Sequence, residues 1–126
     1  MISGTHPARH ARMDSPHMPR ILFLCARNRL RSPTAEHVFA GRPGIETDSA
    51  GVNRDAEVPV SAEHLSWADV VVVMERRHEA KLRRDFGQLL KNKRVVCLDI
   101  PDDYEYREPA LVALLEQRAK RFLPPS

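Results

Sequence analysis

Residues 20–36 read RILFLCARNRLRSPTAE, and this stretch decides how the chain is expected to fold. Residues 20–25 form a short apolar run followed by polar residues, a pattern typical of a strand buried inside a parallel sheet. A helix start is indicated by Pro33 and Glu36, because proline and acidic residues are favoured in the first helical turn. The stretch therefore predicts a strand, a polar loop and a helix in direct succession.

The rest of the chain continues this alternation. Further strands are expected at residues 45–49, 69–74 and 94–100, and further helices at 61–68, 75–90 and 108–122. Ser61 is expected to cap the helix over 61–68, with His64 at the capping-box distance. The order βαβαβαβα predicts an α/β fold in one domain, a four-stranded parallel sheet with helices on both faces.

Ligands of such sheets bind beyond the carboxyl ends of the strands. This rule brings three predicted loops to one rim of the molecule, namely residues 26–32, 75–78 and 101–107. Any chemistry of the domain is therefore expected on these loops.

Length and composition suit one soluble domain. The chain has 126 residues, is 42% hydrophobic and 29% charged, and has no apolar run long enough to span a bilayer. Residues 1–19 carry three prolines and three histidines but no apolar core, so we expect a disordered extension and no secretory signal. The folded domain is expected over residues 20–126, and Met18 is an alternative start.

Charge and cysteine content narrow the classes of function. The net charge is +3, and the arginine excess favours anions such as phosphates. Nucleic-acid binding is not indicated, because RNA-binding aromatic motifs and zinc-finger spacings are absent from the sequence. Cys25 and Cys97 do not make a disulfide framework, which favours a reduced, cytoplasmic protein. No metal or cofactor is implied.

The loop after the first predicted strand carries the candidate chemistry. Cys25 ends that strand and Arg31 follows six residues later, at the predicted helix start. Peptide N–H groups and the helix dipole favour an anion at such a place, and a guanidinium adds a planar, two-pronged donor. A thiol in this field is readily deprotonated, and the thiolate is the nucleophile. One loop could thus supply both a nucleophile and an anion site.

Residues 21–39, ILFLCARNRLRSPTAEHVF, resemble the phosphate-loop segment of the low-molecular-weight protein tyrosine phosphatases. In that family a strand is followed by C-x-x-N-x-x-R-S-P and by a helix containing A-E. Residues 48–51, DSAG, resemble the strand end D-S-A-[AG] of the family, and residues 68–74 with His78 resemble its A-D-x-hydrophobic-x-x-M segment. The resemblance covers residues 20–123.

The resemblance implies roles for individual residues. Cys25 would attack phosphorus and become a phosphocysteine, and Arg31 would hold the equatorial oxygens of the phosphoryl group. The residues implied in binding the phosphate or substrate are Ala26, Arg27, Asn28, Arg29, Leu30, Arg31, Ser32 and Tyr104. The residues implied in supporting the loop are Asn28, Ser32, Ser49 and His78, with Ser32 donating to the sulfur.

The leaving group needs a proton, which the family takes from an Asp in a D-P-Y segment. Here residues 101–104 read PDDY, and alignment on Tyr104 puts Asp102 at the acid position and Asp103 where proline would stand. Asp102 is our first choice as general acid and Asp103 the second. A further departure is Leu30, which replaces a second cysteine of many members, so their protective disulfide is not expected here.

The function indicated by the sequence is hydrolysis of phosphomonoesters, with protein phosphotyrosine as the first expectation. Residues 52–58 contain no aromatic side chain to form the opposite pocket wall, so phosphoarginine, a small phosphoester or a nucleotide stays open as substrate. Two other functions also stay open: an arsenate reductase on the same scaffold, and a non-catalytic module that binds phosphate or a phosphoprotein. The partner is expected to be the phosphorylated substrate, with no membrane and an open oligomeric state.

Overall fold

The computed structural model describes residues 18–123 of the chain. The extension predicted over residues 1–19 lies outside the described residues, except for Met18 and Pro19. None of the helices in the described part has the length and apolar content that crossing a lipid bilayer requires.

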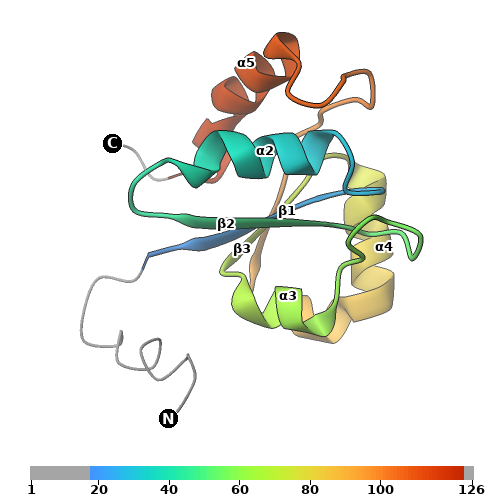
Figure 1. Ribbon diagram of the computed structural model, residues 1–126. Coiled ribbons are helices and arrows are strands. Elements are labelled where there is room, and N and C mark those ends of the chain that lie inside the picture. The colour runs from blue at the N-terminus through green and yellow to red at the C-terminus, as the bar shows by residue number, and fades with distance from the viewer. Residues whose placement is uncertain (1–17, 124–126) are drawn as a thin grey trace.

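Four parallel strands form one sheet in the order β2-β1-β3-β4 (Figure 1). The strands are β1 (Arg20–Cys25), β2 (Glu46–Gly51), β3 (Val70–Val73) and β4 (Arg94–Cys97). The register aligns Cys25 with Gly51 and Leu24 with Val73, so the strands end together at one edge. The predicted four-stranded parallel sheet in a single domain is therefore confirmed.

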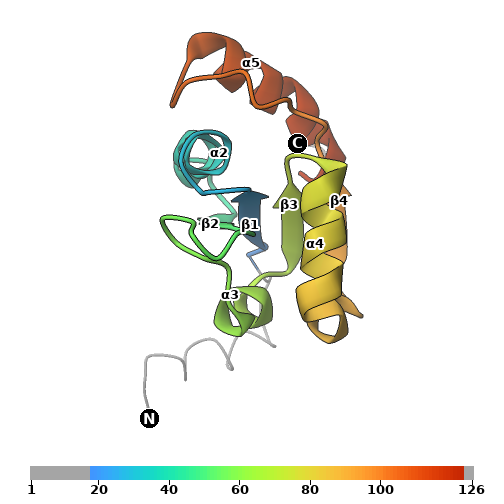
Figure 2. The same cartoon turned by 90° about the vertical axis from the view of Figure 1, so that its right-hand side faces the viewer.

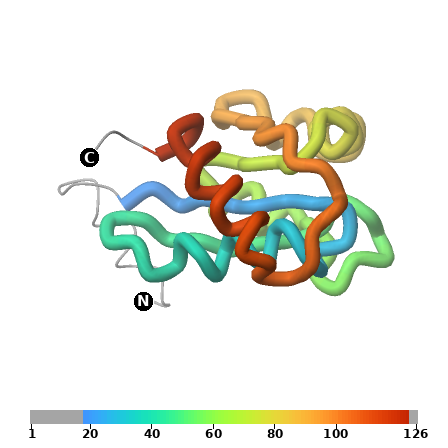
Figure 3. The backbone as a smooth tube through the Cα atoms, turned by 90° about the horizontal axis from the view of Figure 1, so that it is seen from above, coloured from blue at the N-terminus to red at the C-terminus, as the bar shows by residue number. Residues whose placement is uncertain are grey.

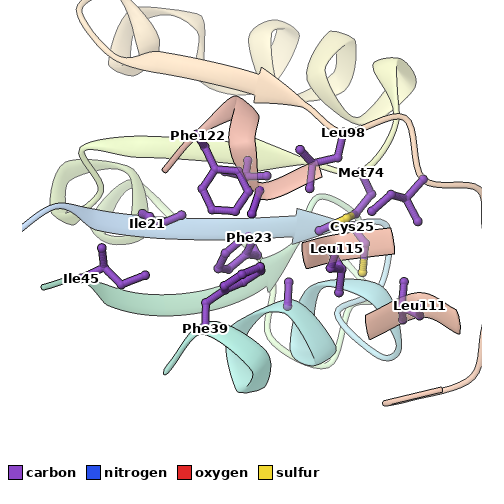
Figure 4. Close-up of a cluster of buried hydrophobic side chains, with 14 residues drawn as sticks. Ile21, Phe23, Cys25, Phe39, Ile45, Met74, Leu98, Leu111, Leu115 and Phe122 are labelled. Carbon is purple, nitrogen blue, oxygen red and sulfur yellow. The ribbon is translucent and has the colours of Figure 1, made fainter. Parts of the chain in front are cut away.

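Helices cover both faces of this sheet, as predicted (Figure 2). Helices α2 (Arg31–Ala40) and α5 (Pro109–Arg118) lie on one face, and α3 (Ala62–Trp67) and α4 (Arg76–Phe86) on the other. Alternate side chains of β1 enter the two cores, because successive residues of a strand point to opposite faces. Phe23 packs with Phe39 and Phe122 on the α2–α5 side (Figure 4), and Leu24 packs with Leu65 and Leu82 on the α3–α4 side.

Several predicted boundaries need correction. The helix predicted over 75–90 ends as an α-helix at Phe86 and tightens into the 3₁₀ segment η2 (Gly87–Leu90), where glycine weakens the α-helix. β4 stops at Cys97 rather than residue 100, because Asp99 takes a left-handed φ of 56° and leads the chain out of the sheet. The last helix, predicted over 108–122, ends at Arg118 and is followed by η3 (Ala119–Arg121).

The capping box predicted at the start of α3 is confirmed. Ser61 Oγ accepts a hydrogen bond from His64 N at 3.3 Å, and Ser61 N donates to His64 Nδ1 at 3.0 Å. Histidine thus replaces the usual Glu or Gln of this motif, because its ring nitrogen is an equivalent acceptor.

The segments that follow β1, β2 and β4 gather at one end of the molecule (Figure 3). This is the carboxyl edge of the parallel sheet, where the sequence places its candidate chemistry.

Candidate active site

In the loop between β1 and α2, peptide carbonyl groups are hydrogen-bonded to the segment after β2, whereas peptide N–H groups are left unpaired in the described part of the chain. The carbonyls of Cys25, Ala26 and Arg27 accept hydrogen bonds at 2.9–3.0 Å from the peptide N–H groups of Val52, Asn53 and Glu57. By contrast, the N–H groups from Arg27 to Ser32 donate to no acceptor within residues 18–123. Unpaired N–H groups at a helix N-terminus form an anion site.

Gly51 lets this loop lie directly against the end of β2. A Cβ at this position would stand 2.5 Å from Ala56 Cβ and 2.7 Å from the carbonyl oxygen of Ala26. Both separations are far shorter than van der Waals contact. The glycine of the DSAG segment is therefore needed for the close approach of the loop backbone.

Asn28 fixes the loop from within. Its φ of 57° is left-handed, a conformation that asparagine tolerates better than most residues. Its buried side-chain amide donates to Ser32 Oγ and to Ser49 Oγ, both at 3.0 Å. Ser49 Oγ in turn donates to Glu36 Oε1 at 2.5 Å, a contact for which the sequence analysis assigned no role. The loop is thereby tied to β2 and to α2.

Cys25 lies at the base of this loop. Its side chain is buried, and its sulfur lies 3.0 Å from Ser32 Oγ. The hydroxyl of Ser32 can donate to a thiolate at this distance, as the sequence predicts.

The Arg31 side chain is buried, and its guanidinium is held by hydrogen bonds from Nη1. Its Nη1 donates to Glu75 Oε2 at 2.5 Å and to the carbonyl oxygen of Ile100 at 2.7 Å. Its Nε has no hydrogen-bond partner within residues 18–123 and lies 3.6 Å from Asp102 Oδ1. The Nε edge is therefore available for a two-pronged hydrogen bond to an anion.

Glu75 is shared between two arginines. Arg77 Nε donates to Glu75 Oε1 at 2.7 Å, while Arg31 holds the other oxygen. The Arg77 hydrogen bond and the neighbouring Arg31 lower the pKa of Glu75 from 4.5 to about 2, although burial opposes them. Glu75 is thus ionised at neutral pH and keeps Arg31 oriented. Sequence reasoning missed this residue, and its position directly after β3 is the signal that could have found it.

A hollow of about 470 Å³ opens over the loop, and we call it the loop hollow. It is lined by Cys25, Ala26, Arg27, Arg29, Leu30, Arg31, Asn53, Arg77 and Asp102. Of the two candidate acids, Asp102 lines the loop hollow and Asp103 does not. Tyr104 is also absent from the lining, because it packs against the apolar core of the α2–α5 face. Asn53 and Arg77 were not expected, since neither belongs to a recognisable motif.

The other two arginines of the lining are paired at the surface. Arg27 lies 3.3 Å from Asp55 and Arg29 lies 3.9 Å from Glu57, with all four side chains more than half exposed. Such solvated ion pairs are weak and easily exchanged. Residues 18–123 hold no group of His, Cys, Asp and Glu side chains that could bind a metal ion.

His78, predicted to support the loop, is buried behind Glu75 and outside the Asn28 network. Its Nδ1 accepts a hydrogen bond from Glu75 N at 3.2 Å, which assigns the ring proton to Nε2. Nε2 has no partner within residues 18–123. Burial, and secondarily the charge of Arg31, lower the pKa of His78 from 6.5 to about 4.

The lowered pKa of His78 predicts that the folded protein loses stability in acid. Between pH 6.5 and 4 the unfolded chain protonates His78 while the folded chain does not, so stability present above pH 6.5 is lost as pH falls. At pH 4.5 we expect a loss of about 2–3 kcal/mol relative to pH 7. Urea unfolding of the wild type and of His78→Gln at both pH values isolates this contribution. An equal loss in both proteins would contradict it.

Comparisons with known proteins show which solved structures share this architecture. No family model and no curated protein matches the sequence. Solved structures do match, and they define the class: the chain has the fold of the low-molecular-weight protein tyrosine phosphatases. The resemblance found in the sequence is confirmed at the level of the fold.

Three of these structures illustrate the match. Tyrosine phosphatase Wzb from Escherichia coli K30, in complex with phosphate, gives a TM-score of 0.68 at 22% identity, over 84% of this chain and 96% of that chain. The low-molecular-weight protein tyrosine phosphatase SP-PTP from Streptococcus pyogenes gives 0.68 at 14% identity, over 85% and 95%. YwlE arginine phosphatase from Geobacillus stearothermophilus gives 0.64 at 24% identity, over 82% and 89%.

Proposed function

We propose that this protein is a phosphatase that hydrolyses phosphomonoesters through a phosphocysteine at Cys25. The observation that carries the proposal is the convergence of three groups on the loop hollow. These groups are the Cys25 sulfur, the unpaired N–H groups of the loop and Nε of Arg31, which makes no hydrogen bond within residues 18–123 and lies 3.6 Å from Asp102. Together they provide a nucleophile and a preorganised site for the charge that develops on the phosphoryl oxygens.

In the first step, the Cys25 thiolate attacks phosphorus and forms a sulfur–phosphorus bond. The bond between phosphorus and the leaving oxygen breaks, and Asp102 donates its proton to that oxygen. The loop N–H groups and Arg31 hold the three equatorial oxygens meanwhile. Asp102 is the carboxyl of the loop hollow and lies beside Arg31, which favours it over Asp103.

In the second step, water attacks the phosphocysteine. Asp102, now a carboxylate, takes a proton from the water, the sulfur–phosphorus bond breaks, and inorganic phosphate leaves with the thiolate restored. One solved YwlE structure is described as a mutant with a phosphorylated active-site serine. Phosphoryl transfer to an active-site side chain is thus known for a protein with this fold.

Protein phosphotyrosine is the first candidate substrate, because tyrosine phosphatases are among the structures that share the fold. Phosphoarginine, in which the bond that breaks joins phosphorus to a guanidine nitrogen and Asp102 would protonate that nitrogen, is the second candidate. One observation favours it. No aromatic side chain lines the loop hollow within residues 18–123, so nothing there would stack on a phenyl ring. The charged lining instead suits a polar leaving group.

The other two functions have less support. An arsenate reductase that passes oxidation along its own thiols would need a second cysteine at the site. Cys97, the other cysteine, does not line the loop hollow, and burial raises its pKa. A module that only binds phosphate would need neither the nucleophile nor Asp102.

The proposal is tested with the wild-type protein in reductant and without added metal. We expect hydrolysis of para-nitrophenyl phosphate, and acid quenching during turnover should trap a phosphoryl group on the peptide that contains Cys25. Hydrolysis without this label would overturn the mechanism. Phosphate binding without hydrolysis would favour the binding module, and arsenate-dependent thiol oxidation would favour the reductase. Parallel assays with phosphotyrosine and phosphoarginine peptides rank the two substrates.

A further inference from the structure

Asp102 lies on a segment that is tied down at its two ends. At the first end, Ile100 N donates to Met74 O at 2.8 Å and Ile100 O accepts from Arg31 Nη1 at 2.7 Å. At the second end, Arg107 N donates to Thr34 Oγ1 at 2.8 Å. The Asp102 side chain is itself 57% exposed and forms no hydrogen bond within residues 18–123. Its position is therefore set by the backbone of residues 100–107 and by its ion pair with Arg31 Nε at 3.6 Å.

The Thr34 side chain is positioned to hold the second end of this segment, at Arg107. It is fully buried, and its hydroxyl donates to the carbonyl oxygen of Leu30 at 2.6 Å. Because that bond uses the only hydroxyl proton, the lone pairs of Oγ1 are left to accept from Arg107 N. The same oxygen thus joins the phosphate loop, through Leu30, to the segment that carries Asp102.

The first turn of α2 holds both ends of this segment. Arg31 binds Ile100 and Thr34 binds Arg107, and residues three apart in a helix lie on the same face. Arg107 has a φ of 60°, a left-handed conformation that is unfavourable for arginine. A fixed acceptor for its N–H group offsets that cost. Between the two ends, Tyr104 adds an apolar anchor in the core.

We propose that Thr34 is a positioning residue whose hydroxyl ties residues 100–107, the segment that carries Asp102, to the loop between β1 and α2. We call its two hydrogen bonds, to Leu30 O and from Arg107 N, the latch. The inference rests on the proposed phosphatase function, in which Asp102 protonates the leaving group. If the latch is lost, the second end of the segment is freed while the contacts at Ile100, Tyr104 and the Asp102–Arg31 ion pair remain, and Asp102 is less often in reach of the leaving oxygen. Proton donation should then suffer more than attack by Cys25.

The kinetic test compares Thr34→Val, which keeps the shape but removes the hydroxyl, with Thr34→Ser, which keeps the hydroxyl. Each is assayed on para-nitrophenyl phosphate, whose leaving group needs little protonation, and on benzyl phosphate, whose alkoxide needs a proton. The readout is the ratio of the two kcat/KM values. In Thr34→Val we expect the benzyl phosphate value to fall about tenfold further than the para-nitrophenyl phosphate value, a fraction of a full general-acid contribution. Thr34→Ser should keep the wild-type ratio.

An equal fall on both substrates, or an unchanged ratio in Thr34→Val, would overturn the latch. A second measurement does not depend on activity: hydrogen exchange of the Arg107 backbone amide, followed by NMR. We expect this amide to be protected in the wild type and in Thr34→Ser and to exchange faster in Thr34→Val. If the wild type is protected but hydrolyses neither ester, the phosphatase proposal fails while the latch contact stands. An Arg107 amide that is unprotected in the wild type would refute the contact itself.

Discussion

Replacing Cys25 with serine is expected to remove turnover of para-nitrophenyl phosphate and leave phosphate binding in place. A hydroxyl is a far weaker nucleophile than a thiolate, and the side chain that contacts the Cys25 sulfur, the Ser32 hydroxyl, is not a base that could activate it. Loss of a nucleophile has cost another hydrolase about 10⁶-fold in kcat, and we expect a loss on the order of 10⁵-fold or more here. Steady-state kinetics and phosphate titration by calorimetry measure the two properties.

The matched control for this change is Cys97→Ser. Cys97 ends β4, away from the lining of the loop hollow, and its thiol donates to Asp99 Oδ1 at 3.4 Å. We expect this variant to keep the wild-type turnover. Comparable loss in both serine variants would point to a general effect of thiol removal and against Cys25 as nucleophile. Loss of phosphate binding in Cys25→Ser alone would show instead that the loop had collapsed.

Replacing Asp102 with asparagine is expected to lower kcat/KM for benzyl phosphate about 100-fold, in the range of a lost general acid. The effect on para-nitrophenyl phosphate should be much smaller, because that leaving group departs without a full proton. Asp103→Asn is the neighbouring control, since Asp103 is exposed and does not line the loop hollow. Steady-state assays of the three proteins on both esters measure this difference.

The opposite ranking would move the acid to Asp103 and revive the second choice made from the sequence. Equal, small effects of both substitutions would mean that neither Asp102 nor Asp103 is the general acid. The step drawn for Asp102 would then be wrong.

Much of the fold follows from local sequence. The strand at 20–25 and the helix start after it are encoded in consecutive residues, so an apolar run and Pro33 predict them. Glu36, expected in the first turn of this helix, lies beyond it, and the N-cap residue Leu30 makes no side-chain hydrogen bond. Element ends were less accurate, as at Gly87 and Asp99, because a few residues there balance nearly equal conformations. Cys25 and Arg31 could be paired as candidates because one short loop holds both.

The long-range contacts that complete the candidate site could not be predicted from local sequence patterns. Glu75 meets Arg31 across 44 residues and Arg107 meets Thr34 across 73, and no local period encodes such pairs. Tyr104 illustrates the same limit, since alignment gives its place along the chain but not the core into which its ring packs. Only the arrangement of the strand ends brings these residues together.

The segment that follows β2 has an evolutionary consequence. It holds the loop through the peptide N–H groups of Val52, Asn53 and Glu57, and the one ion pair that residues 18–123 show from these three side chains to the loop, Glu57 with Arg29, is solvated. Every amino acid except proline supplies a peptide N–H group, so these hydrogen bonds exclude only proline at the three positions. Their spacing is not free, because one inserted or deleted residue would shift a donor away from its carbonyl. Relatives of this chain should therefore keep the length of this segment more strictly than its letters.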